Sequence, residues 1–429
     1  MPKQLHCTFC DRARNEVRHL VSGRVQDVFM CDRCVNDALR TITAEDKKAA
    51  STSSAPVKDT LRKPQEIKAH LDQYVVGQDK AKRALSIAIY NHYKRRFKVR
   101  SGVASTVEIE KSNILLAGPS GTGKTHLARS IAKFLGLPFF VGDANKMTQA
   151  GYVGDDAESV LQGLVSDADG DVERAQWGVV FLDECDKIAR KSGRGASGYR
   201  DVTGEGVQQA LLKLVEGTKV LLPRGMGAKL VSADLQPTDM FDTTNTLFIF
   251  SGSFAGIEDI VERRIHKAAS IGFGAASREK LSQSDIYEHI TEEDILEFGL
   301  IPELVGRLPV LTTTLELSTE DIVHVLTKPK NAIVRQFQAL FEMDNIDLRF
   351  TDDALRAIGV EAKKRPTGCR ALRGILEKVL EPYSFEAPSD PTIESILITE
   401  EAVGGSPAVI SRRGASEVSP AVPVQLVGG

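Results

Sequence analysis

Short apolar runs alternate with segments of helical character through the middle of the chain. The apolar runs lie at 113–117, 139–141, 178–182 and 246–250. Helical segments precede and separate them, for example at 79–94 and 126–135. Strands that are apolar throughout and alternate with helices belong to parallel sheets covered on both faces. The pattern therefore predicts an α/β fold in which helices flank a parallel sheet.

The pattern changes on both sides of this central region. After Leu311, helical stretches and apolar runs at 346–350 and 393–398 predict a small α+β domain. Residues 43–63 are charged, rich in Ser and Ala and without apolar periodicity, which is typical of a flexible linker. The end of the chain is rich in Gly, Ser, Pro and Val, and we expect it to be disordered. The predicted segments are an N-terminal domain at 1–42, the linker at 43–63, a large domain at 64–312, a small domain at 313–400 and a disordered tail at 401–429.

The composition narrows the class of protein. The 429 residues include 55 Lys and Arg against 58 Asp and Glu, which gives a formal charge of −3, and 42% are hydrophobic. This balance disfavours a disordered chain and gives no global reason to bind nucleic acid or anionic lipid. No run approaches the ~18 to 20 apolar residues that span a bilayer, and the first residues lack the apolar core of a secretion signal. We therefore expect a cytoplasmic protein.

Four of the six cysteines form two pairs near the N-terminus, Cys7 with Cys10 and Cys31 with Cys34. In a reducing compartment, such pairs favour a metal over disulfides. Four thiolates complete a tetrahedral Zn²⁺ site that leaves no position open for water, so the metal would be structural. The alternatives are an accidental cluster and a redox pair.

A glycine-rich turn follows the strand predicted at 113–117. Residues 118–125 read Gly-Pro-Ser-Gly-Thr-Gly-Lys-Thr, which matches the GxxxxGK[ST] phosphate loop between a strand and a helix. Its glycines let backbone N–H groups turn towards phosphates at the start of the helix. Lys124 is expected to reach the β and γ phosphates, and the Thr125 hydroxyl to coordinate Mg²⁺. A plain glycine turn is the alternative.

A pair of carboxylates gives a second signature of the same chemistry. Asp183 and Glu184 follow the strand predicted at 178–182, at the edge where ligands of such sheets bind. Asp183 can hold Mg²⁺ through its water shell, and Glu184 can orient or deprotonate the attacking water. The pair could instead cap the next helix. With the phosphate loop before them, these residues predict hydrolysis of a nucleoside triphosphate.

Further motifs make the chain similar to the AAA+ ATPases, and among them to the unfoldase subunits of the Clp protease. The resemblance covers about residues 7–398. Residues 74–78 resemble the segment that packs against adenine, Arg307 lies in a segment resembling that of the arginine finger, and Arg370 in one resembling that of the second sensor arginine. An arginine supplied in trans implies a ring of subunits, and the family assembles as a hexamer.

The resemblance implies a set of site residues. The catalytic residues would be Glu184, Lys124, Asp183 and Arg307. The ATP-binding residues would be Val75, Val76, Pro119, Ser120, Gly121, Thr122, Gly123, Lys124, Thr125, His126 and Arg370. The Mg²⁺ ligands would be Thr125 and Asp183. The implied cofactors are ATP, Mg²⁺ and one structural Zn²⁺ per chain.

Two glycine-containing loops resemble protein-handling loops of the family. The first pore loop would be Gly151, Tyr152, Val153 and Gly154. An exposed aromatic there would grip polypeptide without demanding a sequence, whereas the alternative is a buried tyrosine in a hairpin. The loop that docks on the ClpP peptidase would be Ile271, Gly272 and Phe273. Its apolar residues suit the hydrophobic cleft of a partner, and insertion into this chain's own core is the alternative.

The favoured function is that of an ATP-dependent unfoldase. A homohexamer would pull tagged or unfolded proteins through its pore and deliver them to ClpP, while the zinc domain recruits substrates or adaptors and dimerises. The chain shows no protease constellation of its own, so the peptidase must be a partner. The alternatives are a zinc-module ATPase that remodels nucleic-acid complexes, which the charge balance disfavours, and a nucleotide-gated scaffold.

The sequence also departs from the family pattern. The family commonly has an Arg-Lys-His loop where residues 223–230 stand here, and no such triplet is present. This puts in doubt the substrate-tag preferences carried by that loop. Cys185 and Cys369 replace more common residues, and we expect both to be small buried or half-buried side chains without a ligand role.

Overall fold

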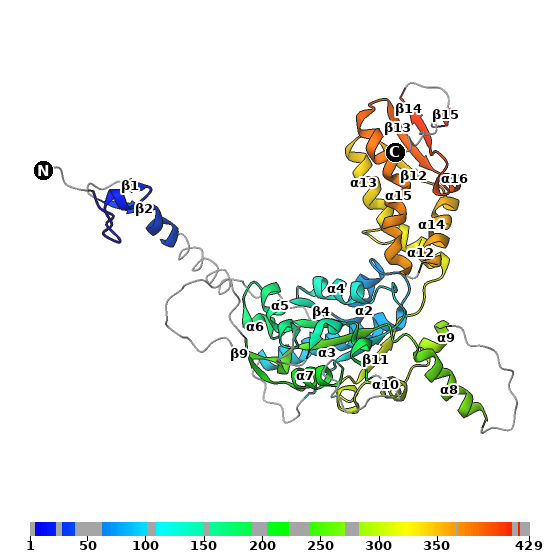
Figure 1. Cartoon of the computed structure of the whole chain (residues 1–429), viewed down its shortest axis with the longest axis horizontal. Coiled ribbons are helices and arrows are strands. Elements are labelled where there is room, and N and C mark those ends of the chain that lie inside the picture. The colour runs from blue at the N-terminus through cyan, green and yellow to red at the C-terminus, as the bar shows by residue number, and fades with distance from the viewer. Residues whose placement is uncertain are drawn as a thin grey trace. The chain divides into compact units, whose positions relative to one another are not determined.

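The computed structural model divides the chain into two compact units, Met1–Leu61 and Arg62–Gly429 (Figure 1). The described residues are 5–22, 28–38, 62–100, 109–148, 155–190, 204–222, 240–270, 283–365, 367–413 and 419–420. Within these ranges, no helix is long and apolar enough to cross a membrane. Short 3-10 turns lie at Arg14–Glu16, Ala144–Lys146, Cys185–Ile188, Thr243–Asn245, Gly368–Arg370 and Ala387–Ser389.

The first unit has almost no hydrophobic core. Strand β1 (Leu20–Ser22) pairs antiparallel with β2 (Phe29–Cys31), and residues 32–38 are helical. Among the described residues of this unit, Cys7 and Cys31 are the only buried hydrophobic side chains. So little buried apolar surface does not offset the conformational entropy lost on folding. A bound metal is the natural source of the missing free energy.

The second unit is built on the predicted parallel sheet. Across it, the strands are β11 (Val310–Thr313), β3 (Ile114–Ala117), β10 (Leu247–Gly252), β7 (Val179–Asp183) and β4 (Phe139–Asp143). Every neighbouring pair in this order is parallel. All five carboxyl ends therefore lie along one edge, where the phosphate loop and the carboxylate pair both emerge.

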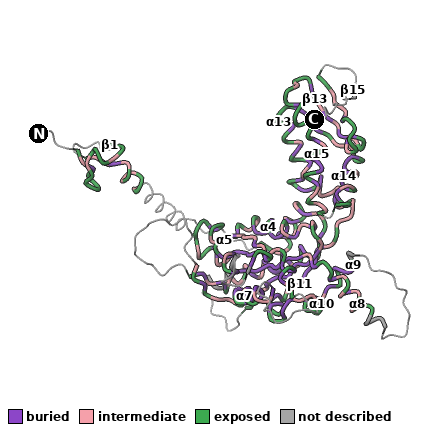
Figure 2. The backbone as a smooth tube through the Cα atoms, in the orientation of Figure 1, coloured by how far each residue is buried: buried purple, intermediate pink, exposed green. Residues whose placement is uncertain are grey.

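Helices cover both faces of this sheet, as the apolar strands require. They are α2 (Pro64–Asp72), α3 (Asp79–Arg100), α4 (Lys124–Leu135), α5 (Ser159–Asp167), α6 (Val172–Ala175), α7 (Glu205–Glu216), α8 (Ile257–Ser270), α9 (Gln283–Glu288), α10 (Glu292–Phe298) and α11 (Pro302–Val305). Helices α2, α3 and α4 pack on the face that carries Ile114 and Leu116. Helices α5, α7, α8, α10 and α11 pack on the face that carries Leu115 and Ala117. Figure 2 shows how buried residues concentrate on the sheet between these layers.

Short strand pairs complete this part, β5 (Met147–Thr148) with β6 (Asp155–Asp156) and β8 (Lys219–Leu221) with β9 (Met240–Asp242).

A separate core belongs to the small domain. Its helices are α12 (Thr319–Thr327), α13 (Ile333–Met343), α14 (Asp352–Lys364), α15 (Ala371–Glu386) and α16 (Glu400–Val403). Its strands, in order across the sheet, are β12 (Asp347–Phe350), β13 (Ile393–Ile398), β14 (Val409–Arg412) and β15 (Ser419–Pro420). The small α+β character predicted for this region is therefore present.

The prediction of a disordered tail from residue 401 is wrong for its first part. Helix α16 begins at Glu400, and β14 pairs antiparallel with β13, with Ile410 opposite Ile396. The composition misled because Gly405, at φ 103°, lies in a tight turn that returns the chain along β13. Residues 421–429 lie outside the described part of the chain.

Candidate nucleotide site and zinc site

The phosphate loop connects the central strand β3 to the amino end of α4, as its sequence predicts. The Gly118 N–H donates to the Gly252 carbonyl at 3.2 Å, which ties the start of the loop to β10. A Cβ added at Gly118 would clash with the side chain and backbone of Thr314, so only glycine allows this approach. The Thr314 hydroxyl in turn lies 2.7 Å from that of Thr122. The loop is thus held between β10 and the segment that follows β11.

Lys124 points its ammonium back into the loop. Its Nζ donates to the carbonyls of Gly118 at 2.7 Å and Pro119 at 2.9 Å, and the side chain is buried. Burial lowers the pKa of Lys124 to about 8, and the nearby charge of Arg370 acts in the same direction, whereas Asp183 opposes it. The loop therefore holds a cation at its centre whose charge is costly to keep out of water.

The second predicted motif meets the first at the carboxyl edge of the sheet. The Thr125 hydroxyl donates to Oδ2 of Asp183 at 3.0 Å, although 58 residues separate them. Oδ1 of Asp183 accepts from the backbone N–H of Glu184 at 3.1 Å. Glu184 is exposed and has φ 59°, a left-handed conformation that non-glycine residues adopt at a cost. The backbone thus turns sharply there and leaves the carboxylate accessible to solvent and ligand.

A buried carboxylate joins the ends of β7 and β10. Asp186 accepts from the backbone N–H and from the hydroxyl of Ser253, both at 3.1 Å, and pairs with the ammonium of Lys187 at 3.0 Å. The hydroxyl of Ser251, one residue before the end of β10, is buried without a hydrogen-bond partner among the described residues. Asp186 therefore fixes the strand end beside the phosphate loop.

The phosphate loop borders a cavity of about 360 Å³, whereas Asp183, Glu184 and Asp186 do not line it. Its lining residues are Tyr74, Val75, Val76, Gly121, Thr122, Gly123, Lys124, Thr125, His126, Leu317, Val325, Cys369 and Arg370. The structure thus brings together nearly all predicted ATP-binding residues. Pro119 and Ser120 belong to the loop but do not line the cavity. The sequence reasoning missed Leu317 and Val325, which carry no motif of their own and reach the cavity only through the tertiary fold. It also missed Cys369, which precedes the predicted sensor Arg370 and was expected to have no ligand role.

The small domain forms one wall of the cavity. A Cβ added at Gly121 would lie 2.7 Å from the carbonyl of Thr367, so the two loops touch. Cys369, expected to have no role in a site, is half-buried in this wall, and burial raises the pKa of its thiol to about 11, with Asp321 adding to the effect. Arg370 ends the turn that precedes α15 and caps the amino end of that helix. The guanidinium is exposed and lines the cavity.

Another part of the cavity wall is the segment between α2 and α3, which was predicted to pack against adenine. Two contacts attach this segment to the small domain and to the connection leading to it. The Gln78 side chain donates to the carbonyl of Leu315 at 2.8 Å and accepts from its N–H at 2.9 Å. The carbonyl of Gln73 accepts from the N–H of Lys330 at 3.0 Å. The segment is therefore coupled to residues on both sides of the small domain's first helix.

Arg307 lies apart from this cavity. It precedes β11, and its carbonyl accepts a hydrogen bond at 3.1 Å from the side chain of Asn113. Asn113 precedes the neighbouring parallel strand β3. Arg307 is therefore at the amino edge of the sheet, whereas the phosphate loop is at the carboxyl edge. Its guanidinium is half-exposed and pairs with Glu216 at 3.0 Å. Within one chain, the structure does not bring Arg307 to the other predicted catalytic residues.

The four N-terminal thiols meet as a zinc site requires. The ligand atoms of Cys7, Cys10, Cys31 and Cys34 all lie within 4.8 Å of one another. The sulfurs of Cys10 and Cys31 are 3.6 Å apart, close to the ~3.8 Å expected between ligands of a tetrahedron with Zn–S bonds of about 2.3 Å. Backbone N–H groups donate to two of the sulfurs, at 3.3 Å to Cys7 and 3.5 Å to Cys31. This donor set fits a closed Zn²⁺ site.

Several predicted residues lie outside the described part of the chain. They are the pore-loop residues Gly151, Tyr152, Val153 and Gly154 and the docking-loop residues Ile271, Gly272 and Phe273. Most of the predicted linker and the segment at 223–230 also lie outside it.

Comparison with known families agrees with this architecture. A ClpX C4-type zinc finger family matches residues 5–43, an AAA domain family (Cdc48 subfamily) matches 109–311, and the C-terminal, D2-small domain of ClpB protein matches 317–397. The chain is 44% identical to the ATP-dependent Clp protease ATP-binding subunit ClpX of Treponema denticola over 411 residues, which cover 94% of each chain. It is 43% identical to the protein of the same description from Borrelia duttonii over 397 residues, covering 92% of this chain and 90% of that one.

Proposed function

Because this chain belongs to the ClpX family of ATP-binding subunits of the Clp protease, we propose that it unfolds tagged proteins and delivers them to the ClpP peptidase. The AAA domain makes the chain an ATPase. Its N-terminal module is a zinc finger with four cysteine ligands. The coupling of hydrolysis to unfolding, the hexameric pore and the transfer to ClpP are the proposed part.

The observation that carries this proposal is the composition of the cavity wall. The phosphate loop and Tyr74 come from the large domain, whereas Val325 and Arg370 come from the small one. A nucleotide in this cavity would contact both cores. Loss of the γ phosphate would then change contacts on both sides and shift the angle between the two domains. Such a shift, repeated around a ring, is a means of moving a polypeptide along an axis.

The hydrolytic step follows from the groups around the loop. Phosphate oxygens would replace the Gly118 and Pro119 carbonyls as acceptors for Lys124, and a cation there stabilises charge on the transferred phosphoryl. Thr125 and Asp183, already in contact, provide oxygen ligands that suit Mg²⁺. Glu184 is accessible and can orient and deprotonate the attacking water.

The position of Arg307 supports a ring. At the amino edge of its own sheet, this guanidinium cannot reach the phosphates bound at the carboxyl edge of the same chain. A neighbouring copy can receive it, and an arginine supplied in this way stabilises the charge of phosphoryl transfer. We propose a homohexamer, as the family implies. Tyr152 would grip substrate in its pore, Phe273 would dock on ClpP, and the zinc domain would dimerise and recruit substrates or adaptors.

The test uses the purified chain, ATP and a stably folded fluorescent protein with a degradation tag, with and without ClpP. Wild type should abolish the fluorescence, and Glu184→Gln should not, although it binds ATP. If fluorescence persists with wild type for every tag and adaptor supplied, the unfoldase proposal is wrong. ATPase activity stimulated by nucleic acid, but not by tagged protein, would favour the nucleic-acid alternative.

A second variant tests the peptidase contact. Phe273→Ala should hydrolyse ATP and unfold the substrate at wild-type rates but lose co-sedimentation with ClpP. Phe385→Ala is the control, since Phe385 is an exposed aromatic on α15. Unchanged association of Phe273→Ala with ClpP would remove the docking assignment.

A further inference from the structure

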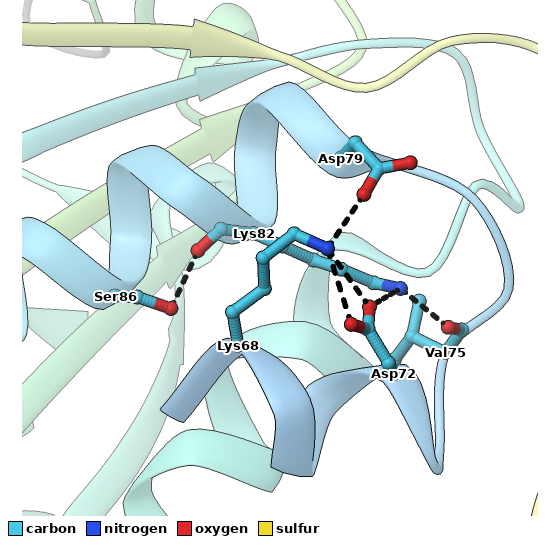
Figure 3. Close-up of polar contacts among 6 residues, drawn as sticks. All are labelled: Lys68, Asp72, Val75, Asp79, Lys82 and Ser86. Carbon is cyan, nitrogen blue, oxygen red and sulfur yellow. Dashed lines mark hydrogen bonds and ion pairs between the residues drawn. The ribbon is translucent and has the colours of Figure 1, made fainter. Parts of the chain in front are cut away.

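Figure 3 shows a lysine ammonium that contacts the segment 73–78, part of which lines the cavity. Lys82 lies on the first turns of α3, and only 3% of its side chain is exposed. Its Nζ donates to the backbone carbonyl of Val75 and to Oδ1 of Asp72, both at 2.7 Å. The ammonium therefore connects helix α3, the end of α2 and the cavity wall.

The rest of this cluster lies nearer to solvent. Asp72 also accepts from Lys68 at 3.1 Å, and Lys68 pairs with Asp79 at 2.7 Å. Burial disfavours the charge of Asp72, but hydrogen bonds from Lys82 and Lys68 outweigh this effect and hold the pKa of the carboxyl below its usual value. Pairs as exposed as Lys68 with Asp79 contribute little to stability.

A buried ammonium contributes little net stability to a fold compared with an apolar side chain. Desolvation of the charge is costly, and an apolar side chain of similar length would often serve the core equally well. What an apolar side chain cannot do is donate to a backbone carbonyl. The distinctive contribution of Lys82 is therefore to fix where the Val75 carbonyl lies.

That carbonyl determines which backbone groups face the cavity. The Val75 N–H donates to the carbonyl of Leu71 at 2.8 Å, so both backbone polar groups of Val75 are engaged inside the protein. Val76, which also lines the cavity, has no backbone hydrogen bond among the described residues. Its carbonyl and N–H remain available to a ligand.

A carbonyl and an N–H from one residue match one purine better than the other. Adenine presents a donor, its exocyclic amino group, next to an acceptor ring nitrogen. Guanine presents an acceptor oxygen next to a donor ring nitrogen on the same edge. A backbone carbonyl and N–H held in place would form hydrogen bonds with adenine but would leave polar groups unpaired opposite guanine. Sites that leave polar groups unpaired with the wrong ligand discriminate strongly against it.

We propose that Lys82 is the positioning residue for base selection: through the Val75 carbonyl it holds the Val76 backbone so that adenine is preferred to guanine. This inference rests on the proposed binding of ATP with its base against residues 74–76. Lys82 itself does not line the cavity and acts only through the segment that it fixes.

The test compares Lys82→Met with Lys68→Met. Both variants remove a lysine that contacts Asp72, but only the first loses the contact with Val75. Steady-state hydrolysis of ATP and GTP, with equilibrium binding of ADP and GDP, gives the preference for each variant. Lys82→Met should raise KM for ATP about tenfold with kcat within about twofold, and should lower the ATP-to-GTP ratio of kcat/KM by about tenfold. Lys68→Met should retain the wild-type ratio.

Other results have definite meanings. A Lys82→Met protein that is folded and keeps the wild-type ratio overturns the inference, as does an equal loss with both nucleotides. If Lys82→Met does not fold, Lys82→Gln, which keeps a donor towards Val75, is tested in its place. Its stability should fall, whereas its ATP-to-GTP ratio of kcat/KM should stay nearer to that of the wild type. A wild-type ratio in a Lys82→Gln protein whose donor is displaced from Val75 would refute the proposal. A wild-type enzyme that does not distinguish ATP from GTP would instead overturn the proposed placement of the base.

Discussion

The side chain of Gln78 pairs with the backbone of Leu315 as a strand would, donating to its carbonyl at 2.8 Å and accepting from its N–H at 2.9 Å. Gln78 is largely buried and adopts a positive φ of 61°, so the segment after Val76 is shaped around this pairing. Leu315 lies between β11 and α12, on the connection to the small domain. One amide group therefore links the cavity wall to the point about which the two domains would move.

Loss of this link should separate hydrolysis from mechanical work. Gln78→Ala leaves the Leu315 carbonyl and N–H without these partners, which costs about 1 to 3 kcal/mol. We expect ATP hydrolysis to continue while the number of ATP molecules consumed per unfolded substrate rises several-fold. Arg83→Ala, at an exposed position on α3, is the control and should behave as wild type. An unchanged ATP cost for Gln78→Ala would show that the link carries no coupling.

Mixing two inactive variants tests whether Arg307 acts on a neighbouring chain. Arg307→Ala keeps Glu184, and Glu184→Gln keeps Arg307, so each variant alone should be inactive in ATP hydrolysis. In mixed rings, some interfaces would combine an intact Glu184 with an intact Arg307 from the next chain. The mixture should therefore regain part of the wild-type rate, measured as phosphate release. A mixture as inactive as its components would place Arg307 outside the neighbour's site.

Binding of ATP should take up protons at slightly alkaline pH. Burial lowers the pKa of Lys124 to about 8, so the amine is about half neutral at that pH. The phosphates favour the ammonium and raise this pKa in the complex, so affinity should fall as pH rises above about 8. Calorimetry of Glu184→Gln with ATP, in buffers of different ionisation enthalpy, should show uptake of roughly half a proton at pH 8 and about a tenth at pH 7. Equal uptake at both values would contradict the assignment.

Removal of zinc should unfold the first unit and spare the second. A chelator should expose four thiols to a colourimetric reagent and abolish the structure of residues 5–22 and 28–38, because cysteine ligands are the only buried hydrophobic side chains described there. ATP hydrolysis should remain within about twofold of the untreated rate. Cys31→Ser should lose the metal, whereas Cys369→Ser should retain one Zn²⁺ per chain. A first unit that stays folded without metal would disprove the dependence.

The hydrogen bonds that Asp186 accepts from Ser253 should contribute more to the free energy of unfolding than its ion pair with Lys187. Asp186→Ala leaves the backbone N–H of Ser253 without its acceptor and should lower the free energy of unfolding by about 1 to 3 kcal/mol. Asp186→Asn keeps an acceptor oxygen and should lose less. Lys187→Ala removes only a pair with a half-exposed ammonium and should cost less than about 1 kcal/mol. Urea unfolding of the three variants measures these losses of unfolding free energy. If the ion pair were the main contribution, Lys187→Ala would show a larger loss than Asp186→Asn.

Local signals explain what the sequence revealed. The phosphate loop and the pair Asp183–Glu184 carry their chemistry within a few consecutive residues, each after an apolar strand. Since the carboxyl ends of parallel strands share an edge, the two motifs had to meet, and Thr125 and Asp183 do so. The zinc ligands could also be predicted from the sequence, because the spacing of their cysteines is itself the signal.

Long-range packing explains what the sequence concealed. Leu317 and Val325 look like ordinary core residues until the small domain forms the cavity wall. Lys82 has the appearance of a solvent-facing helix residue, yet its charge is buried. Strand β14 was missed because its neighbour β13 lies across a glycine turn, and pairing with that neighbour outweighed the local composition.

The opposite placement of Arg307 and the phosphate loop has a consequence for stoichiometry. If Arg307 completes the site of a neighbouring copy, as proposed, the copies must join head to tail, so their interface has no two-fold symmetry. An open row of such copies always contains one site fewer than it has chains, since the last copy lacks a donor. Only closure makes the two numbers equal. The gain of that final site favours the closed ring whenever nucleotide binds better to a completed site than to an open one.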